Sequence, residues 1–164
     1  MTAGAAVTAA EPLARLKERG QTLAVAESLT GGLLAATIVD VPGASAVFRG
    51  GLVVYATDLK GSLAGVPGEL LAARGPVDPD VALALARGAR ERCRADWGLA
   101  TTGVAGPDPQ DGHPVGEVYV GIAGPDLADV RRLTLMGDRP AIRAGSVTAA
   151  LALLTDTLVS RRFA

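Results

Sequence analysis

A short polar stretch, AESLTGG at residues 26–32, separates two apolar runs, TLAVA and LLAATIV. The first run predicts a buried strand, and the second predicts a helix that begins at or just after Ser28 and runs to Val39. The first turn of a helix carries unpaired N–H groups and partial positive charge. Beside those donors, the Ser28 hydroxyl could attack a carbonyl group and the donors could stabilise the oxyanion. A plainer alternative stays open, in which Ser28 or Thr30 only caps the helix.

A tyrosine and a lysine stand five residues apart in VVYATDLKG, at the expected end of another strand. An ammonium group near Tyr55 would stabilise the phenolate and lower the pKa of that tyrosine. A phenolate could in turn remove the proton of a serine hydroxyl and make it a nucleophile. The alternative is that Tyr55 lies at the rim of the sheet and Lys60 is a solvated surface charge.

Two further features are typical of ligand binding. The segment TTGVAGP at residues 101–107 is a second glycine-containing turn behind an expected strand. Two such turns at strand ends of one α/β sheet can form a common binding site. Arg139 and Arg143 are four residues apart at the start of the last expected helix, so they share a face and could bind a phosphate or carboxylate. An ordinary turn and two surface arginines remain the alternative.

The elements that must position these residues alternate along the chain. Helices are expected over 11–20, 28–39 and about 16 residues from Asp78, with a last one opened by Asp138 and Pro140; strands are expected over 22–26, 46–56, 98–102, 117–123 and 130–136. The alternation continues without an internal repeat or a linker. It favours one three-layer α/β/α domain with a mixed sheet over residues 11–164, preceded by a flexible tail at residues 1–10.

Composition excludes several functional classes. The 164 residues are 49% hydrophobic and 20% charged, which argues against disorder. A net charge of −1 and 3% aromatic residues argue against nucleic-acid binding. A single histidine, with no trusted spacing among the acidic residues, argues against a metal site. One cysteine, no apolar run near the roughly 18 residues of a membrane span and no secretory signal predict a cytoplasmic protein without a membrane partner.

The order of the motifs is more specific than any one of them. The series runs VAESLTGG, DVPGASAVFRGGLVVYATDLK, GPVDPDVALALARGAR, TTGVAGPDPQDGHPVGEVYVGIA and GDRPAIRAGSVTAAL. From about residue 11 to residue 160, it resembles the C-terminal domain family of the competence/damage-inducible CinA proteins. The family's stand-alone members are nicotinamide-mononucleotide deamidases. The resemblance therefore implies hydrolysis of the carboxamide of this nucleotide to nicotinate mononucleotide and ammonia, a compact α/β/α fold, no cofactor and a homo-oligomer, which we expect to be a dimer.

The resemblance also implies roles for individual residues. Ser28 corresponds to the nucleophile, and Tyr55 and Lys60 complete a Ser-Tyr-Lys arrangement. Expected substrate-binding residues are Glu27, Thr30, Gly31, Gly32, Thr102, Gly103, Ala105, Gly106, Arg139 and Arg143. In the mechanism expected from these roles, the N–H groups of the Thr30–Gly32 turn stabilise the oxyanion, a charged Lys60 lowers the pKa of Tyr55, and Tyr55 passes the proton to the departing ammonia. Whether Tyr55 or a neutral Lys60 is the base stays open.

Two other functional classes compete with the amidohydrolase. One is a non-catalytic nucleotide-binding or regulatory CinA-like module, because a fold does not determine an activity. The other is a short-chain reductase, which also uses Ser, Tyr and Lys. In those enzymes lysine follows tyrosine by four residues rather than five, and the first strand here lacks their glycine fingerprint.

Overall fold

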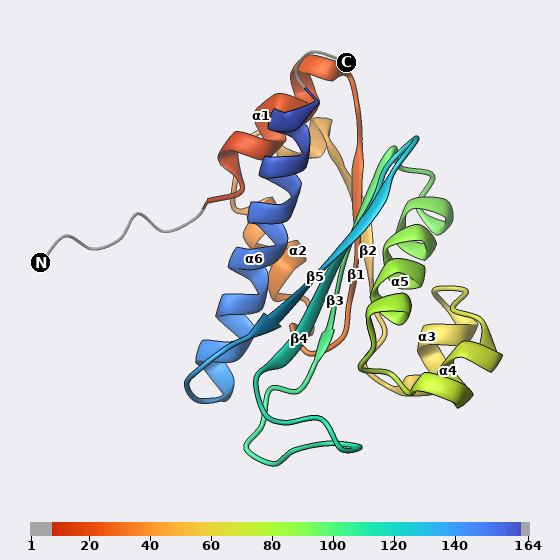
Figure 1. Ribbon diagram of the computed structural model, residues 1–164. Helices are drawn as coiled ribbons and strands as arrows, with labels where there is room; N and C mark the ends of the chain where they lie inside the picture. Colours follow the sequence, from red (N-terminus) through yellow and green to blue (C-terminus); the bar gives the residue numbers. More distant parts are fainter. Residues whose placement is uncertain (1–7, 162–164) are drawn as a thin grey trace, which may run out of the picture.

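The computed structural model describes residues 8–161 and shows one mixed sheet covered by helices on both faces (Figure 1). In the described residues the sheet has the strand order β2-β1-β3-β4-β5. The strands are β1 (Leu23–Glu27), β2 (Phe48–Val53), β3 (Trp97–Gly103), β4 (Glu117–Ala123) and β5 (Ala128–Thr134). The three-layer α/β/α fold with a mixed sheet is confirmed, whereas the tail expected at residues 1–10 falls mostly outside the described residues.

Three helices cover one face of the sheet and three cover the other (Figure 1). The first group is α1 (Ala10–Arg19), α2 (Leu33–Val39) and α6 (Arg139–Ser160); the second is α3 (Thr57–Ser62), α4 (Gly68–Arg74) and α5 (Pro79–Arg92). Alternate residues of β1 face opposite layers: Val25 packs in the core below α6, and Ala24 packs in the core below α5. The small side chain of Ala24 fits the close approach of α5 to the sheet, where Gly98 of β3 and Gly121 of β4 also have no room for a Cβ.

Strand direction places the candidate residues at one edge of the sheet. Strand β1 is parallel to both β2 and β3, β4 is antiparallel to β3, and β5 is antiparallel to β4. The carboxyl ends of β1, β2, β3 and β5 therefore lie at the same edge, together with the start of β4. The connections that leave this edge lead to α2, α3, the β3–β4 loop and α6, and the candidate site residues lie in these connections, at the strand ends before them or in the helices that follow.

Capping residues begin two helices where the sequence predicts it. The Asp78 side chain accepts hydrogen bonds from the N–H groups of Asp80 and Val81, and Asp138 accepts one from Ala141. The long helix α6 is apolar enough to cross a membrane by length and composition alone. Its apolar side chains Ile142, Val147, Leu151, Leu154 and Leu158 instead pack in the core against the sheet.

Three elements differ from the sequence-based prediction. Helix α2 begins at Leu33 rather than near Ser28, for a reason given below. Helix α4 was not expected, because it buries no residue and so has no apolar stripe in its sequence. The short 3₁₀ turn η1 (Ala44–Ala46), which follows Gly43, was not expected either.

Candidate active site

Ser28 lies at the end of β1, beside Lys60 of α3. The Lys60 Nζ donates a hydrogen bond to the Ser28 Oγ over 2.9 Å. Both side chains are buried, with Ser28 7% and Lys60 1% exposed. The parallel pairing of β1 with β2 makes this contact possible, because β2 ends next to β1 and α3 begins four residues later.

Burial changes the chemistry of Lys60. Its ammonium also donates to the backbone carbonyls of Val54, over 2.8 Å, and Tyr55, over 3.2 Å. These acceptors are neutral, and desolvation by burial lowers the pKa of Lys60 from 10.5 to about 8. A substantial fraction of Lys60 is therefore uncharged in mildly alkaline solution, and an uncharged amine 2.9 Å from a hydroxyl can accept its proton.

Glu27 explains the late start of α2. Its buried carboxylate accepts hydrogen bonds from the N–H groups of Leu34, over 2.8 Å, and Ala35, over 3.1 Å. A carboxylate at this position satisfies unpaired donors and interacts favourably with the helix dipole. Glu27 thus does the capping that the alternative reading of the sequence gave to Ser28 or Thr30, and its carboxylate occupies the helix end that a ligand anion would need.

The turn between β1 and α2 holds its conformation through glycines and threonines. Gly31 and Gly32 have φ angles of 57° and 106°, which L side chains rarely adopt. The Gly31 N–H donates to the Ser28 carbonyl, so it is not a free oxyanion donor. The Thr30 hydroxyl contacts that of Thr101 in β3 over 2.8 Å. In contrast, the Leu29 N–H has no hydrogen-bond acceptor within residues 8–161.

Tyr55 lies at the entrance to the site rather than next to Ser28. Its side chain is 60% exposed, and its hydroxyl accepts a hydrogen bond from the Arg139 guanidinium over 3.1 Å. Lys60 reaches only the backbone carbonyl of Tyr55. Arg139 also donates to the Gly106 carbonyl over 2.6 Å, so it joins three connections at the sheet edge. Within the described residues Arg139 has no carboxylate partner.

Arg143 is one turn further along α6 and plays a different structural part. Its guanidinium donates to the carbonyls of Leu29, over 3.0 Å, and Thr30, over 2.9 Å. These bonds fix the turn that follows Ser28 onto α6. The two arginines share a helix face, as their spacing predicts, but they contact different loops: Arg139 the β3–β4 loop and Arg143 the turn after β1.

A pocket of about 300 Å³ opens beside Ser28. One wall comes from the β1 and β2 ends and the other from the β3–β4 connection. Predicted residues that line it are Ser28, Tyr55, Lys60, Thr102, Gly103, Ala105, Gly106 and Arg139. The other residues predicted to bind substrate do not line the pocket; they are Glu27, Thr30, Gly31, Gly32 and Arg143.

Several lining residues were missed by the sequence analysis. They are Leu29, Thr57, Pro76, Val77, Val104, Asp108, Pro109 and Gln110, whereas Pro107 belongs to the turn expected to bind a ligand. Asp108 and Gln110 lie in the loop dense in glycine and proline, which was the available signal. No local sequence signal marks Pro76 as a lining residue. Its place at the pocket depends on a long-range contact, because its carbonyl accepts a hydrogen bond over 2.7 Å from the Thr102 hydroxyl, 26 residues further along the chain. Within residues 8–161, no group of three His, Cys, Asp or Glu side chains could hold a metal ion.

Comparison with known proteins assigns the chain to a family. The CinA C-terminal domain profile matches residues 6–158. The chain is 56% identical over 146 residues to a CinA-like protein of Frankia casuarinae, and 52% identical over 150 residues to one of Geobacter sulfurreducens. These alignments cover 89% and 90% of the chain but 34% and 36% of the relatives. The chain thus spans about a third of the length of the curated relatives it matches.

Solved structures show the same fold. The competence/damage inducible protein CihA of Agrobacterium tumefaciens has a TM-score of 0.87 at 33% identity, covering 92% of this chain and 93% of that one. A CinA superfamily protein of Enterobacter cloacae has a TM-score of 0.89 at 28% identity, with 96% of each chain covered. With profile, sequence and structure in agreement, the chain belongs to the CinA C-terminal domain family.

Proposed function

We propose that the chain is an amidohydrolase that converts nicotinamide mononucleotide to nicotinate mononucleotide and ammonia. The observation that carries the proposal is the buried contact between the Lys60 amine and the Ser28 hydroxyl at the floor of a pocket. An amide is a weak electrophile, so its hydrolysis needs an activated nucleophile, and a desolvated lysine can activate one. The choice of substrate follows the resemblance to the stand-alone family members.

In the proposed reaction Lys60 is the general base. The neutral amine takes the Ser28 proton as the Oγ attacks the carboxamide carbon. The resulting ammonium then protonates the nitrogen as the C–N bond breaks, so ammonia leaves and an ester remains on Ser28. Water attacks the ester and Lys60 takes one water proton. That proton returns to the Ser28 oxygen as the C–O bond breaks, and the product leaves as a carboxylic acid that gives its remaining proton to solvent.

Geometry favours Lys60 over Tyr55 for this role. The Lys60 Nζ touches the serine oxygen, whereas the Tyr55 hydroxyl is held outward by Arg139. For the oxyanion, the N–H of Leu29 is the best-placed candidate, because it directly follows the nucleophile and is unpaired in the described part of the chain. Arg139 at the pocket entrance suits a phosphate, since it has no carboxylate to displace.

The test is release of ammonia from nicotinamide mononucleotide by the purified chain, with the product identified by mass spectrometry. Wild-type protein is expected to turn over in the presence of a metal chelator. The Ser28→Ala variant is expected to lose at least about 10³-fold in kcat while keeping its melting temperature. A fully active Ser28→Ala protein would overturn the serine mechanism.

A panel of other amides, including free nicotinamide, separates this activity from a general amidase. The regulatory module predicts a different result: the nucleotide would raise the melting temperature of wild-type protein, and no ammonia would appear. We also propose, on the family resemblance, that the chain acts in the cytoplasm as a homodimer. Light scattering of the purified chain tests the dimer, which a monomeric mass would contradict.

A further inference from the structure

The loop between β3 and β4 is tied at its base and again near its middle. At the base, the Val104 N–H donates to the Glu117 carbonyl over 3.0 Å, and the Gly116 N–H donates to the Val104 carbonyl over 2.8 Å. Further out, Gln110 and His113 exchange two backbone hydrogen bonds of 3.1 Å and 2.8 Å. The two bonds between Gln110 and His113 connect only residues of the loop, so they do not fix the loop's position relative to the sheet.

Arg139 holds the outgoing limb through the Gly106 carbonyl, and a buried carboxylate anchors the returning limb. Glu117, the first residue of β4, is 6% exposed, accepts a hydrogen bond from the Tyr119 hydroxyl over 3.1 Å and forms an ion pair with the Arg132 guanidinium over 3.0 Å. Its other oxygen is hydrogen-bonded to the His113 Nδ1. Burial opposes ionisation, but the bonds from His113 and Tyr119 and the nearby positive charge outweigh it, so the pKa of Glu117 lies below its ordinary value.

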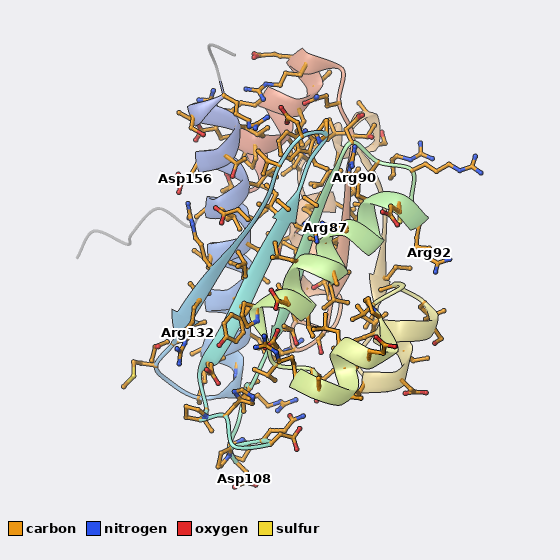
Figure 2. All side chains as sticks on the ribbon, turned by 45° about the vertical axis from the view of Figure 1, so that its right-hand side comes forward. Arg87, Arg90, Arg92, Asp108, Arg132 and Asp156 are labelled. Carbon is orange, nitrogen blue, oxygen red and sulfur yellow. The ribbon has the colours of Figure 1, made fainter. Side chains whose placement is uncertain are left out.

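Only one of the three side chains that contact the Glu117 carboxylate belongs to the loop. Tyr119 is in β4 and Arg132 is in β5, so both hold the carboxylate still within the sheet. His113 lies in the returning limb of the loop and connects it to that fixed acceptor. Figure 2 shows Asp108 at the outer end of this loop, with Arg132 above it on β5.

The anchored segment forms a wall of the pocket. Pro107, Asp108, Pro109 and Gln110 line it, opposite the Ser28 and Lys60 side. The reacting groups come from β1 and α3 and touch none of the anchoring residues through a hydrogen bond. Movement of the wall would therefore change contacts to the substrate without moving the nucleophile or its base.

We propose that His113 is a positioning residue that holds the Pro107–Gln110 wall through its bond to Glu117 and so sets the affinity for the part of the substrate remote from the carboxamide. This inference rests on the proposed function for the identity of that substrate. It assigns a role to a histidine that the sequence analysis left without one in the reaction.

The experiment compares His113→Ala with His113→Asn in steady-state turnover of nicotinamide mononucleotide. His113 is partly exposed, so neither variant should prevent folding. For His113→Ala we expect KM to rise roughly tenfold with kcat within about twofold, the effect of losing one hydrogen bond to a charged group. An asparagine amide nitrogen can occupy the place of Nδ1, so His113→Asn should recover most of the KM.

The matched control is Arg131→Gln on β5, which breaks an exposed ion pair to Asp156 of α6. Its KM and kcat should equal those of wild type. Hydrogen exchange adds a readout without substrate: residues 107–113 should exchange faster in His113→Ala than in wild type or Arg131→Gln.

The outcomes separate the two proposals. An unchanged KM in His113→Ala, a loss confined to kcat, or unchanged exchange of the loop overturns the role of His113 and leaves the activity standing. If wild-type protein releases no ammonia from nicotinamide mononucleotide, the proposed function fails and the substrate role of His113 fails with it. Rescue by asparagine together with faster loop exchange in the alanine variant supports the positioning role.

Discussion

The Nζ of Lys60 lies 2.9 Å from the Oγ of Ser28, although 32 positions separate the two residues in the sequence. The contact depends on neighbouring parallel strands, since Ser28 follows β1 and Lys60 follows β2. Because both groups are shielded from water, the lysine loses its proton more easily than a surface lysine does. Five predictions follow from this pair and from the residues that support it.

The rate should depend on pH through Lys60. Only the neutral amine can act as a base, and its pKa is about 8. We expect kcat/KM to rise with pH, nearly tenfold per unit below the pKa, and to level off above it. Measurement of kcat/KM between pH 6 and pH 10 checks this, with the thermal stability followed at each pH. A rate that falls as pH rises through 8 would contradict a neutral lysine base.

Replacing Lys60 should separate activity from stability. The Lys60→Met variant should lose at least about 10³-fold in kcat. Between pH 8 and pH 10.5 the unfolded wild-type chain still holds the Lys60 proton that the folded chain has released, so wild-type stability rises with pH. The methionine variant lacks this contribution. Its free energy of unfolding, relative to wild type, should fall by up to about 3 kcal/mol across that window.

Chemical denaturation of both proteins at several pH values measures this difference. The other titrating groups are shared, so they cancel in the comparison. Parallel stability curves for wild type and Lys60→Met would mean that Lys60 titrates as an ordinary surface lysine.

Tyr55 should matter less for the chemical step than Lys60 does. Its hydroxyl is exposed and bonded to Arg139, and no hydrogen bond links it to Ser28. We expect Tyr55→Phe to lower kcat by less than about tenfold. Single-turnover kinetics would separate the chemical step from product release. A loss as large as that of Lys60→Met would instead make the phenol the proton carrier.

Glu27 should act on stability through α2. The Glu27→Gln variant keeps the shape but has one acceptor oxygen for the two helix N–H groups and turns an NH2 group toward the other, so the free energy of unfolding should fall by about 1–2 kcal/mol. The control is Asp138→Asn at the exposed start of α6, where asparagine caps equally well and the change should stay within about 0.5 kcal/mol. Equal effects at both positions in urea unfolding would contradict a special role for buried Glu27.

Replacing the two arginines of α6 should change different kinetic constants, KM for Arg139 and kcat for Arg143. Arg139 lines the pocket, so Arg139→Gln should raise KM about tenfold with a small change in kcat. Arg143 holds the backbone behind the nucleophile, so Arg143→Gln should lower kcat about tenfold. Steady-state kinetics of both variants measure the contrast, and an identical KM increase would place both arginines on the substrate.

Local sequence signals predict much of the fold. Asp78 and Asp138, each followed closely by proline, indicate where α5 and α6 begin, because capping is a property of a few neighbouring residues. The apolar run of β1 predicts a buried strand in the same way, and the alternation along β4 and β5 predicts two paired strands. Such signals also place Ser28, Tyr55 and Lys60 near the ends of elements.

What the sequence could not provide is contact between distant residues. The start of α2 was placed too early because the capping side chain was sought at Ser28 and Thr30 inside the turn, while the Glu27 carboxylate reaches forward from the strand before the turn. The distance from Lys60 to Ser28 depends on strand order. The bonds of Arg143 depend on how α6 crosses the sheet, so its spacing from Arg139 could not show that the two bind different loops.

The reversed direction of β4 has one more consequence. The β3–β4 loop leaves the sheet and returns to it at the same edge, held at its base by the hydrogen bonds between Val104 and its neighbours across the hairpin. Residues can therefore be inserted near Asp111 and Gly112 without changing the pairing of the two strands. The lining of the pocket can therefore change in length and composition in this segment, while Ser28 and Lys60 on the opposite wall stay where they are.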